Sequence, residues 1–455
     1  MQHIVAALVM SALAAGAQAA VSPEEVKQLG SALTPWGAEK GASKDGTIPA
    51  YTGGLVKAPS NIQAAGGRLA NPYADETPLF SIDARNYAQH AARLTAGAIE
   101  LLKRYPDYRI DVYPTHRSFP EPPKAVQEAS IRNAGNDQCK LSADGTGLRG
   151  CWGGVPFPIP KSGNEALWNH TARWRVTNEF AGELWLVHSG GETLLNQSRG
   201  YNEYPYYAEG VQPYQGPGQY YQRFQNTIVG PARDAGNVSM IFYPLEYDKL
   251  DQRTWSYTPG QRRVRLAPEF SYDTPSAPMG GAINYDEVGL FAGRADRFDF
   301  KLVGKTEKYV NANSYAIMFG AQRAAILGKQ HLQPGAQRWE LRRVWIVEAV
   351  RKPGARHSAS KRVFYLDEDS WAIVEAEAYD NANRLYRVQH AFTAPDYTSG
   401  AFMTGSFFAA YDLPKQQYVA VFLMGTMPSG FYRTLAERRP EKSLTPESLA
   451  ASGLR

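Results

Sequence analysis

Two pairs of acidic residues in the second half of the chain have the side chains needed for acid–base hydrolysis. Asp286 and Glu287 are adjacent, and Asp296 lies three residues before Asp299. A glycosidase uses two carboxyl groups about 5–10 Å apart across a cleft, one as acid and the other as base or nucleophile. Spacing along the chain does not establish that separation. A hydrolase acting on lipid or carbohydrate is therefore the second of two hypotheses for the function of this sequence.

A run of three carboxylates, Asp367-Glu368-Asp369, has oxygen atoms of the kind that bind calcium. The run lies between two apolar, strand-like segments, a position typical of an exposed hairpin turn. We therefore expect a solvated hairpin tip here and no metal site. His170 and His188 lie near aromatic residues and are expected to be hydrogen-bonded groups in the core or at a rim.

Common catalytic and cofactor motifs do not occur in the sequence. The patterns GxSxG and HExxH, the Walker phosphate loop and the calcium-binding EF-hand loop are all missing. We therefore predict a protein that is not an enzyme, with no catalytic residue, no metal site and no cofactor.

The first twenty residues, MQHIVAALVMSALAAGAQAA, contain no Asp, Glu, Lys or Arg and include a short apolar run. Ala17-Gln18-Ala19 has the small-x-small pattern of a cleavage site, so we predict a signal peptide cleaved near Ala19 or Ala20 and a periplasmic protein. After this segment no apolar run is long enough to cross a bilayer as a helix. The net charge of +5 is dispersed along the chain and gives no basic patch for nucleic acid.

The two cysteines, Cys139 and Cys151, enclose the segment KLSADGTGLRG. In an oxidising compartment, two cysteines this close most simply form a disulfide. They do not fill a four-ligand zinc site, because no nearby histidine or acidic pair completes one. We predict a disulfide that anchors the stiff, proline-rich segment CWGGVPFPIPK that begins at Cys151.

Tyrosine and tryptophan are frequent, with 27 and 9 residues. Many tyrosines lie in the Pro/Gly-rich segment 201–221, where a packed aromatic loop is the simpler interpretation and a ligand surface the alternative. Large aromatic residues on alternating strands must also face some interior, although ordinary core packing explains each of them singly. On this ground the candidate cleft-lining residues are Trp185, Trp255, Tyr257, Trp345 and Trp371.

Alternating apolar residues and turn signals predict a β-rich protein from about residue 172 onwards. Turns are expected at 189–192, 259–260 and 380–381. Helices of crossover length do not separate these strands, so the sheet should be antiparallel.

The longer helices are expected before this β-rich part. Apolar residues spaced by three or four predict one amphipathic helix over 84–105, and shorter helices should begin after Pro123 and Ser162. We predict a signal peptide, an extended and helical segment with the disulfide loop, an antiparallel β domain and a helical tail, over residues 1–20, 21–160, 161–430 and 431–455.

Four segments of the chain resemble, in the same order, one family of secreted bacterial proteins. They are LTPWGAEKGASKDGTIPAYTGG, GGVPFPIPKSGNEALWNH, SYTPGQRRVRLAPEFSYDTP and FAGRADRFDFKLVGKTEKYV. The family is a domain of unknown function that is placed with the LolA/LolB-like periplasmic lipoprotein carriers and outer-membrane receptors. Two segments, Asp286-Glu287 and Asn311-Ala312-Asn313, depart from the pattern expected for the family.

The resemblance implies a mainly β fold with helices, in which a strongly curved antiparallel sheet forms an incomplete β-barrel and helices cover its concave side. It also implies a periplasmic carrier or binding protein for lipids or other hydrophobic molecules. Such a protein would work with a resistance-nodulation-type inner-membrane exporter and an outer-membrane partner. A carrier needs an apolar cleft with a movable cover, and we name the helix over 84–105 as the expected cover.

Overall fold

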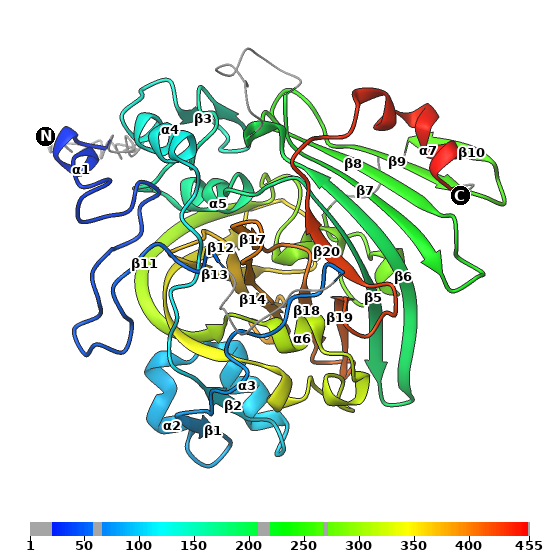
Figure 1. Ribbon diagram of the computed structural model, residues 1–455, viewed down its shortest axis with the longest axis horizontal. Coiled ribbons are helices and arrows are strands. Elements are labelled where there is room, and N and C mark those ends of the chain that lie inside the picture. Colours follow the sequence, from blue (N-terminus) through cyan, green and yellow to red (C-terminus); the bar gives the residue numbers. More distant parts are fainter. Residues whose placement is uncertain (1–20, 58–65, 208–218, 267–271, 454–455) are drawn as a thin grey trace, which may run out of the picture.

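Most of the chain forms one curved sheet of sixteen strands (Figure 1). The computed structural model describes residues 21–57, 66–207, 219–266 and 272–453. The strand order is β1-β2-β12-β13-β14-β15-β18-β19-β5-β6-β7-β8-β9-β10, with β11 paired to β12 and β20 paired to β5. The strands are β1 (Phe80–Ile82), β2 (Ile110–Val112), β5 (Asn178–His188), β6 (Gly191–Glu203), β7 (Tyr220–Gly230), β8 (Val238–Pro244), β9 (Arg253–Thr258), β10 (Arg263–Leu266), β11 (Phe298–Asn311), β12 (Trp339–Arg351), β13 (Lys361–Asp367), β14 (Ile373–Tyr379), β15 (Leu385–Ala391), β18 (Phe408–Asp412), β19 (Gln417–Leu423) and β20 (Phe431–Thr434).

Seven α-helices and several single 3₁₀ turns connect the described strands or cover their faces. The helices are α1 (Pro23–Val26), α2 (Tyr87–His90), α3 (Ala96–Arg104), α4 (Lys124–Ala134), α5 (Gly163–Thr171), α6 (Tyr315–Phe319) and α7 (Pro446–Gly453). The 3₁₀ turns are η1 (Ala91–Arg93), η2 (Pro205–Tyr207), η3 (Ala277–Met279), η4 (Tyr285–Leu290), η5 (Arg323–Ala325), η6 (Pro334–Ala336) and η7 (Glu441–Ser443). Two small hairpins are β3 (Lys140–Leu141) with β4 (Leu148–Arg149), and β16 (Ala394–Asp396) with β17 (Ala401–Met403).

The expected mainly β fold with a curved antiparallel sheet is confirmed. Every strand pairing in the large sheet is antiparallel except the short contact between β2 and β12. The expected hairpin turns lie between β5 and β6, between β9 and β10, and between β14 and β15. Register shifts interrupt several pairings, for example between Leu302 and Gly304 of β11, and such bulges bend a sheet and increase its twist. The sheet therefore curves around α5, α6 and the β16–β17 hairpin (Figure 1).

The two faces of the sheet are covered by different segments. Over β15, Arg387 and Gln389 bond to Glu287 of η4, whereas Val388, which points the opposite way, lies against Gly97 of α3. We call the face that carries η4 the inner face and the face that carries α3 the outer face.

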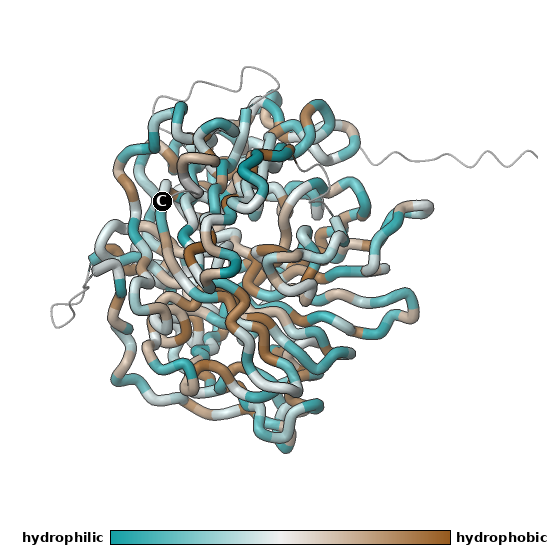
Figure 2. Tube along the Cα trace, turned by 90° about the vertical axis from the view of Figure 1, so that its right-hand side faces the viewer, coloured by the Kyte–Doolittle hydropathy of each residue, from teal (hydrophilic) through white to brown (hydrophobic). Residues whose placement is uncertain are grey.

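Hydrophobic residues concentrate inside the molecule, and the outer loops are hydrophilic (Figure 2).

The helix predicted over 84–105 is broken, and the prediction that it covers a cleft on the concave side is wrong. Leu94 is extended, and the hydroxyl of Thr95 accepts a hydrogen bond from the Ala98 amide at 3.0 Å, so a new helix, α3, begins there. Helix α3 packs tightly on the outer face, where a Cβ at Gly97 would lie 2.8 Å from Cγ1 of Val388. A helix this closely packed is part of the core.

Two carboxylates of β14 hold α3 on the sheet. Glu377 accepts a hydrogen bond from the Gly97 amide at 2.7 Å, and Glu375 accepts one from the Thr95 hydroxyl. Burial and the neighbouring charge of Glu375 together raise the pKa of Glu377 to about 6. Glu377 is therefore protonated at a higher pH in the folded protein than in the unfolded chain.

The segment predicted to be anchored by the disulfide is fixed between α4 and α5. Cys139 and Cys151 form a disulfide, as predicted. The side-chain amide of Asn169 on α5 bonds to both the amide and the carbonyl of Phe157, at 2.8 and 2.6 Å. The hydroxyl of Ser130 on α4 accepts a hydrogen bond from the Val155 amide at 2.9 Å. The predicted helices after Pro123 and Ser162 are present as α4 and α5.

The ends of the chain take a larger part in the sheet than the sequence suggested. The expected helical tail over 431–455 begins with a strand, β20, which pairs with the first residues of β5. The segment expected to be extended and helical contributes β1 and β2. Helix α7 follows β20 and buries Leu449 against the outer face of β8, β9 and β10.

Removing the disulfide tests how far it stabilises this region. Closing a loop with a sequence separation of 12 residues stabilises the folded state by about 3 kcal/mol, because it restricts the unfolded chain. The double variant Cys139→Ser/Cys151→Ser should therefore lose about 2–4 kcal/mol of unfolding free energy in urea titrations. A reductant should lower the stability of the wild type and leave that of the variant unchanged; equal sensitivity of both proteins would contradict the prediction.

The raised pKa of Glu377 predicts a pH dependence of stability. A group whose pKa is higher in the folded state stabilises the protein below its unfolded pKa, and this stabilisation disappears as the pH rises through the folded value. From a pH well below 4.5 to a pH well above 6, this group should lower the unfolding free energy by about 2 kcal/mol. Glu377→Gln should remove that slope in urea titrations. Glu100→Gln, in an exposed pair with Arg104, should retain it.

Candidate functional site

A cavity of about 470 Å³ lies on the inner face of the sheet. Its walls come from two parts of the chain, strands β5 to β9 on one side and the connection 272–294, which carries η3 and η4, on the other. The loop between α5 and β5 and the turn 404–406 close the remaining sides. The volume is within the range of small-molecule binding sites, about 300–1,000 Å³.

Alternation along the strands decides which residues reach this cavity. Ile241 of β8 pairs across the sheet with Phe224 of β7, and both line the cavity, whereas Met240 and Phe242 face the opposite side toward α7. Phe224 and Ile241 are half-buried, so this wall of the cavity can be reached by solvent. Further apolar lining residues are Leu184, Met279, Val288, Phe291, Ala292 and Phe422.

Polar side chains gather at the end of the cavity nearest α5. Gln222 at the start of β7 donates a hydrogen bond to Asn202 of β6 at 2.8 Å. Tyr204 and Tyr221 from the tyrosine-rich segment line the same region, and burial raises the pKa of Tyr221 to about 12. The phenol of Tyr221 therefore stays protonated and can donate a hydrogen bond.

In the tyrosine-rich segment 201–221, some tyrosines pack as in an aromatic loop and others line the cavity as in a ligand surface. Tyr206 packs in the cluster around the disulfide, and Tyr201 packs on the outer face under α7, as an aromatic loop would. Tyr204 and Tyr221 face the cavity, as a ligand surface would. Tyr214 lies outside the described residues.

Two arginines, Arg173 and Arg175, line the cavity from the loop between α5 and β5. Their exposed fractions are 3% and 9%. Arg173 donates to the carbonyl of His170, and Arg175 donates to the carbonyl of Thr171 at 2.7 Å and to Oε1 of Gln222 at 3.3 Å. Neither guanidinium has a carboxylate partner within ion-pair distance among the described residues. The Nε atoms of both arginines are buried there without a hydrogen-bond partner.

The electrostatic surroundings of Arg173 disfavour its charge. Burial lowers the pKa of the Arg173 guanidinium well below its ordinary value, and the neighbouring charge of Arg175 lowers it further. The same two causes, burial first and then the charges of Arg173 and Arg175, lower the pKa of His170. His170 is thus a neutral core histidine whose Nδ1 accepts a hydrogen bond from the Ile373 amide at 2.8 Å, as expected for a core group.

The acidic residues considered for catalysis hold the covering segment in place. Asp286 pairs with Arg362 at 2.9 Å and with Nε2 of His357 at 2.8 Å, and Glu287 pairs with Arg387 at 3.2 Å. Burial raises the pKa of Asp286, but the charge of Arg362 and the hydrogen bond from His357 outweigh it and lower the pKa overall. A general acid in glycoside hydrolysis needs a raised pKa, so Asp286 lacks this property.

Neither carboxylate of the second acidic pair lines the cavity. Asp296 accepts a hydrogen bond from the Tyr272 hydroxyl at 2.9 Å and pairs with Arg294 at 3.3 Å. Asp299 lies at an exposed position of β11 and does not line the cavity. The residues that line the cavity therefore include Asp286 but not the other carboxylates of these two pairs.

The five aromatic residues predicted to line a cleft are not among the residues that line the cavity. Trp185 packs under the guanidinium of Arg323 at 4.6 Å, on the face of β5 opposite Leu184. Trp345 stacks on Trp371 at 6.1 Å, and the indole N–H of Trp371 donates to the carbonyl of Trp36. These side chains fill the hydrophobic core, so a contact with a ligand stays a prediction for them.

Trp255 and Tyr257 of β9 lie on the face of the sheet opposite the cavity, and a ligand contact stays a prediction for them as well. Their side chains join the outer-face cluster with Phe242 and Leu449. Thr254, directly before Trp255, is the residue of β9 that lines the cavity. Successive side chains of a strand point to opposite faces, and aromatic content alone does not indicate which face encloses a cavity.

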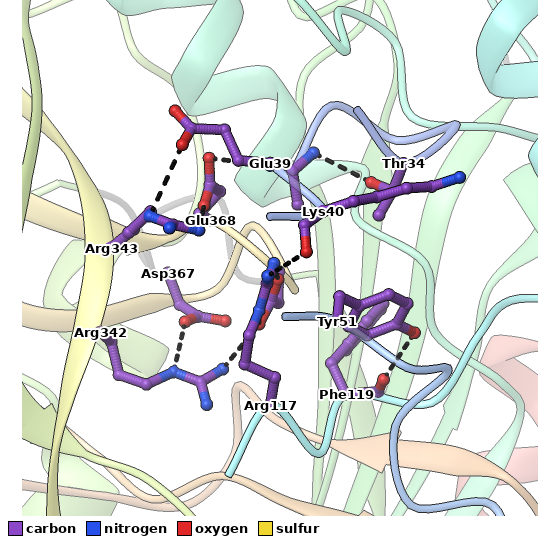
Figure 3. Close-up of polar contacts among 12 residues, drawn as sticks. Thr34, Glu39, Lys40, Tyr51, Arg117, Phe119, Arg342, Arg343, Asp367 and Glu368 are labelled. Carbon is purple, nitrogen blue, oxygen red and sulfur yellow. Dashed lines mark hydrogen bonds and ion pairs between the residues drawn. The ribbon is translucent and has the colours of Figure 1, made fainter. Parts of the chain in front are cut away.

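The predicted solvated hairpin tip at Asp367-Glu368-Asp369 is wrong. The three side chains are 4%, 2% and 3% exposed. Arg342 donates to Asp367 at 3.1 Å (Figure 3). Arg342 also donates to Asp369 at 3.1 Å, and Arg117 donates to Asp369 at 2.5 Å. The turn between β13 and β14 exists, but other parts of the chain bury it.

The N-terminal segment covers this turn and explains its burial. Glu368 accepts hydrogen bonds from the Glu39 amide at 3.1 Å and from Lys305 at 2.6 Å. The carbonyl of Lys40 accepts from Arg117 at 3.3 Å (Figure 3). The acidic run therefore attaches the N-terminal segment to the sheet, and no group of three or more His, Cys, Asp or Glu in the described chain is arranged to hold a metal ion.

The two arginines at the cavity, Arg173 and Arg175, were not among the site residues predicted from the sequence. The sequence around them, HTARWRV, places basic residues two apart between aromatic and apolar neighbours directly after a helix. Residues two apart in an extended segment point to the same side. That spacing was the available signal, and it is weak because exposed strands show it as well.

Residues 81–450 match the family described as "Protein of unknown function (DUF1329)". The chain belongs to this family. An uncharacterized protein of Pseudomonas aeruginosa, PA3922, is 38% identical over 461 residues, which cover 98% of this chain and 97% of that protein. The family resemblance stated from the four sequence segments is confirmed.

Solved structures of other proteins are also similar to this chain. A DUF1329 family protein from Desulfovibrio piger is 12% identical with a TM-score of 0.41, and the match covers 62% of this chain and 95% of that one. A LolA superfamily protein from Nitrosomonas europaea is 11% identical with a TM-score of 0.35, and the match covers 62% and 97% of the two chains.

Among the described residues, no helix is both long and apolar enough to cross a membrane. The predicted signal peptide, residues 1–20, lies outside the described residues.

The buried ionic cluster at the turn between β13 and β14 predicts a large effect of removing one charge. Asp369→Asn leaves Arg117 and Arg342 without their shared partner, and an uncompensated buried charge costs about 3–5 kcal/mol. Urea titration should show a loss of that size. Glu128→Gln, which breaks an exposed pair with Lys124 on α4, should change the unfolding free energy by less than about 0.5 kcal/mol. Similar effects of both substitutions would contradict the assignment.

Proposed function

We propose that this protein is a periplasmic carrier or binding protein for lipids or other hydrophobic molecules. The observation that carries the proposal is the cavity of about 470 Å³ on the inner face of the sheet, between β5–β9 and the connection 272–294. In this proposal the protein works with an inner-membrane exporter and an outer-membrane partner, as the family resemblance implies. Energy for release would then enter through these partners.

The cavity wall has the chemistry required for such a ligand. Phe224, Ile241 and Phe291 present half-buried apolar surface that a ligand would remove from water. Each buried CH₂ group contributes about 0.8 kcal/mol of transfer free energy. Loss of translational freedom and ordering of the ligand offset part of this gain. The resulting affinity can be high enough for capture and low enough for release.

The covering segment gives a route for exchange. Its η4 part is fixed by the ion pairs of Asp286 and Glu287, whereas η3 contacts β6 and ends in two left-handed glycines, Gly280 and Gly281. Glycine adopts this backbone conformation without strain. In the proposal, the part of the connection around η3 opens and closes over the cavity while η4 remains in place.

Filling the cavity tests the proposal. Delipidated protein should bind the uncharged fluorescent dye N-phenyl-1-naphthylamine with a stoichiometry near one. Ile241→Trp adds a large side chain at the centre of the wall and should weaken binding at least about 10-fold in a fluorescence titration. Val229→Trp on β7, at an exposed position outside the lining, should bind as the wild type does.

Two results would contradict the proposal. One is a delipidated wild-type protein that binds no uncharged hydrophobic dye. The other is turnover of ester or glycoside substrates that is lost in Asp286→Asn, which would favour the hydrolase. Circular dichroism of each variant checks that the sheet is intact.

A further inference from the structure

We propose that the cargo is an amphiphile with an anionic head, a carboxylate or a phosphate, and that Arg173 and Arg175 bind this head inside the cavity. The inference rests on the proposed function and adds the chemical class of the ligand. An apolar ligand alone would explain the apolar wall, but it would leave the two arginines unexplained.

The charge balance of the cavity supports an anion at this position. Arg173 and Arg175 are almost completely buried and have no carboxylate within ion-pair distance among the described residues. Removing a charged group from water without a partner is strongly unfavourable, so buried charges in proteins are normally paired. The remaining partner would therefore come from the ligand.

The C-terminal end of α5 compensates only part of the positive charge of Arg173 and Arg175. The carbonyls of His170 and Thr171 accept hydrogen bonds from the two arginines, and the C-terminus of a helix carries about half a negative charge. Two full positive charges exceed this, and Nε of each arginine has no partner in the described chain. A carboxylate or phosphate has enough acceptor oxygens for these groups.

The two carboxylates that line the cavity do not take this role. Asp286 is held by Arg362 and His357, so its charge is already compensated. Asp251 is 86% exposed and pairs with Arg294 at 3.1 Å. Neither forms an ion pair with Arg173 or Arg175.

The surroundings of the arginines are shaped around them. Gly405 has φ of +90°, and a Cβ at this position would collide with Nη2 of Arg173. The guanidinium of Arg175 lies over the ring of Tyr204 at 4.3 Å, and Gln222 accepts from its Nη1. Stacking and hydrogen bonding fix a guanidinium in one orientation, which suits recognition of a planar or tetrahedral anion.

The order of residues along β7 places the head and the apolar body of the ligand. Gln222, which bonds Arg175, is followed on the same face by Phe224, about two strand residues or 7 Å further on. Ile241 lies beside Phe224 on β8. A ligand with its head at the arginines would therefore extend its apolar part over Phe224 and Ile241.

A matched pair of ligands tests the inference. cis-Parinaric acid and its methyl ester have the same fluorescent chain and differ in the charge of the head. Delipidated wild-type protein should bind the acid at least about 10-fold more tightly than the ester. Arg175→Met and Arg173→Met should each remove most of this preference and leave the affinity for the ester within about 2-fold of the wild type. Arg175→Lys should retain part of the preference.

Arg199→Met is the matched control. Arg199 lies at an exposed position of β6 outside the lining, so the substitution removes the same formal charge without touching the cavity. The Arg199→Met variant should prefer the acid over the ester as strongly as the wild type does. If Arg173→Met does not fold, the result for Arg175→Met alone tests the inference, because Arg175 is the more exposed of the two arginines.

The outcomes separate the inference from the proposed function. Equal affinity of the wild type for acid and ester overturns the anionic head and leaves the carrier intact, whereas no binding of either ligand overturns the carrier itself. Loss of the preference in Arg199→Met also overturns the assignment. Lysophosphatidic acid should displace the probe, and inorganic phosphate at the same concentration should not. Displacement by inorganic phosphate would show that the site binds a free anion and not an amphiphile.

Discussion

The cover of the inner face is the constraint on which the rest of the structure depends. A sheet that curves without closing leaves one face that must be buried by another part of the chain. Over β14 and β15, that part is η4, held by the ion pairs Asp286–Arg362 and Glu287–Arg387. These groups are desolvated, so each pair tolerates little displacement. The cover is fixed there, and a hollow is left over β6, β7 and β8.

Buried arginines occur in two different situations in this molecule. Arg117, Arg342, Arg362 and Arg387 each lie within ion-pair distance of a buried carboxylate, and these pairs join segments that are far apart in the sequence. Arg173 and Arg175 lie among carbonyls and a tyrosine ring at a cavity, without such a carboxylate in the described chain. The first situation explains attachment of one segment to another. The second does not, because none of the described carboxylates compensates the charges of Arg173 and Arg175.

The sequence was sufficient for features that depend on local chemistry. The disulfide, the cap at Ser162, the hairpin turns and the antiparallel strands follow from spacing and turn residues. It was insufficient where distant segments meet. The acidic turn after β13 is buried because the N-terminal segment covers it, and the helix over 84–105 is broken because Thr95 caps a new helix while its hydroxyl bonds Glu375, 280 residues away. The sequence also does not show which face of β9 borders the cavity: Thr254 lines it, and Trp255 faces the other side.

The division of the cavity into an arginine end and an apolar wall separates affinity from selectivity. The apolar wall contributes to binding of any ligand that fits, because transfer of hydrocarbon from water is nondirectional. An anionic head gains the contacts with Arg173 and Arg175 but loses its own hydration, so its net contribution to affinity is smaller than the contacts suggest. A neutral head of the same size loses hydration as well and leaves both arginines unpaired. Discrimination between the two ligands therefore arises mainly from the penalty imposed on the neutral one.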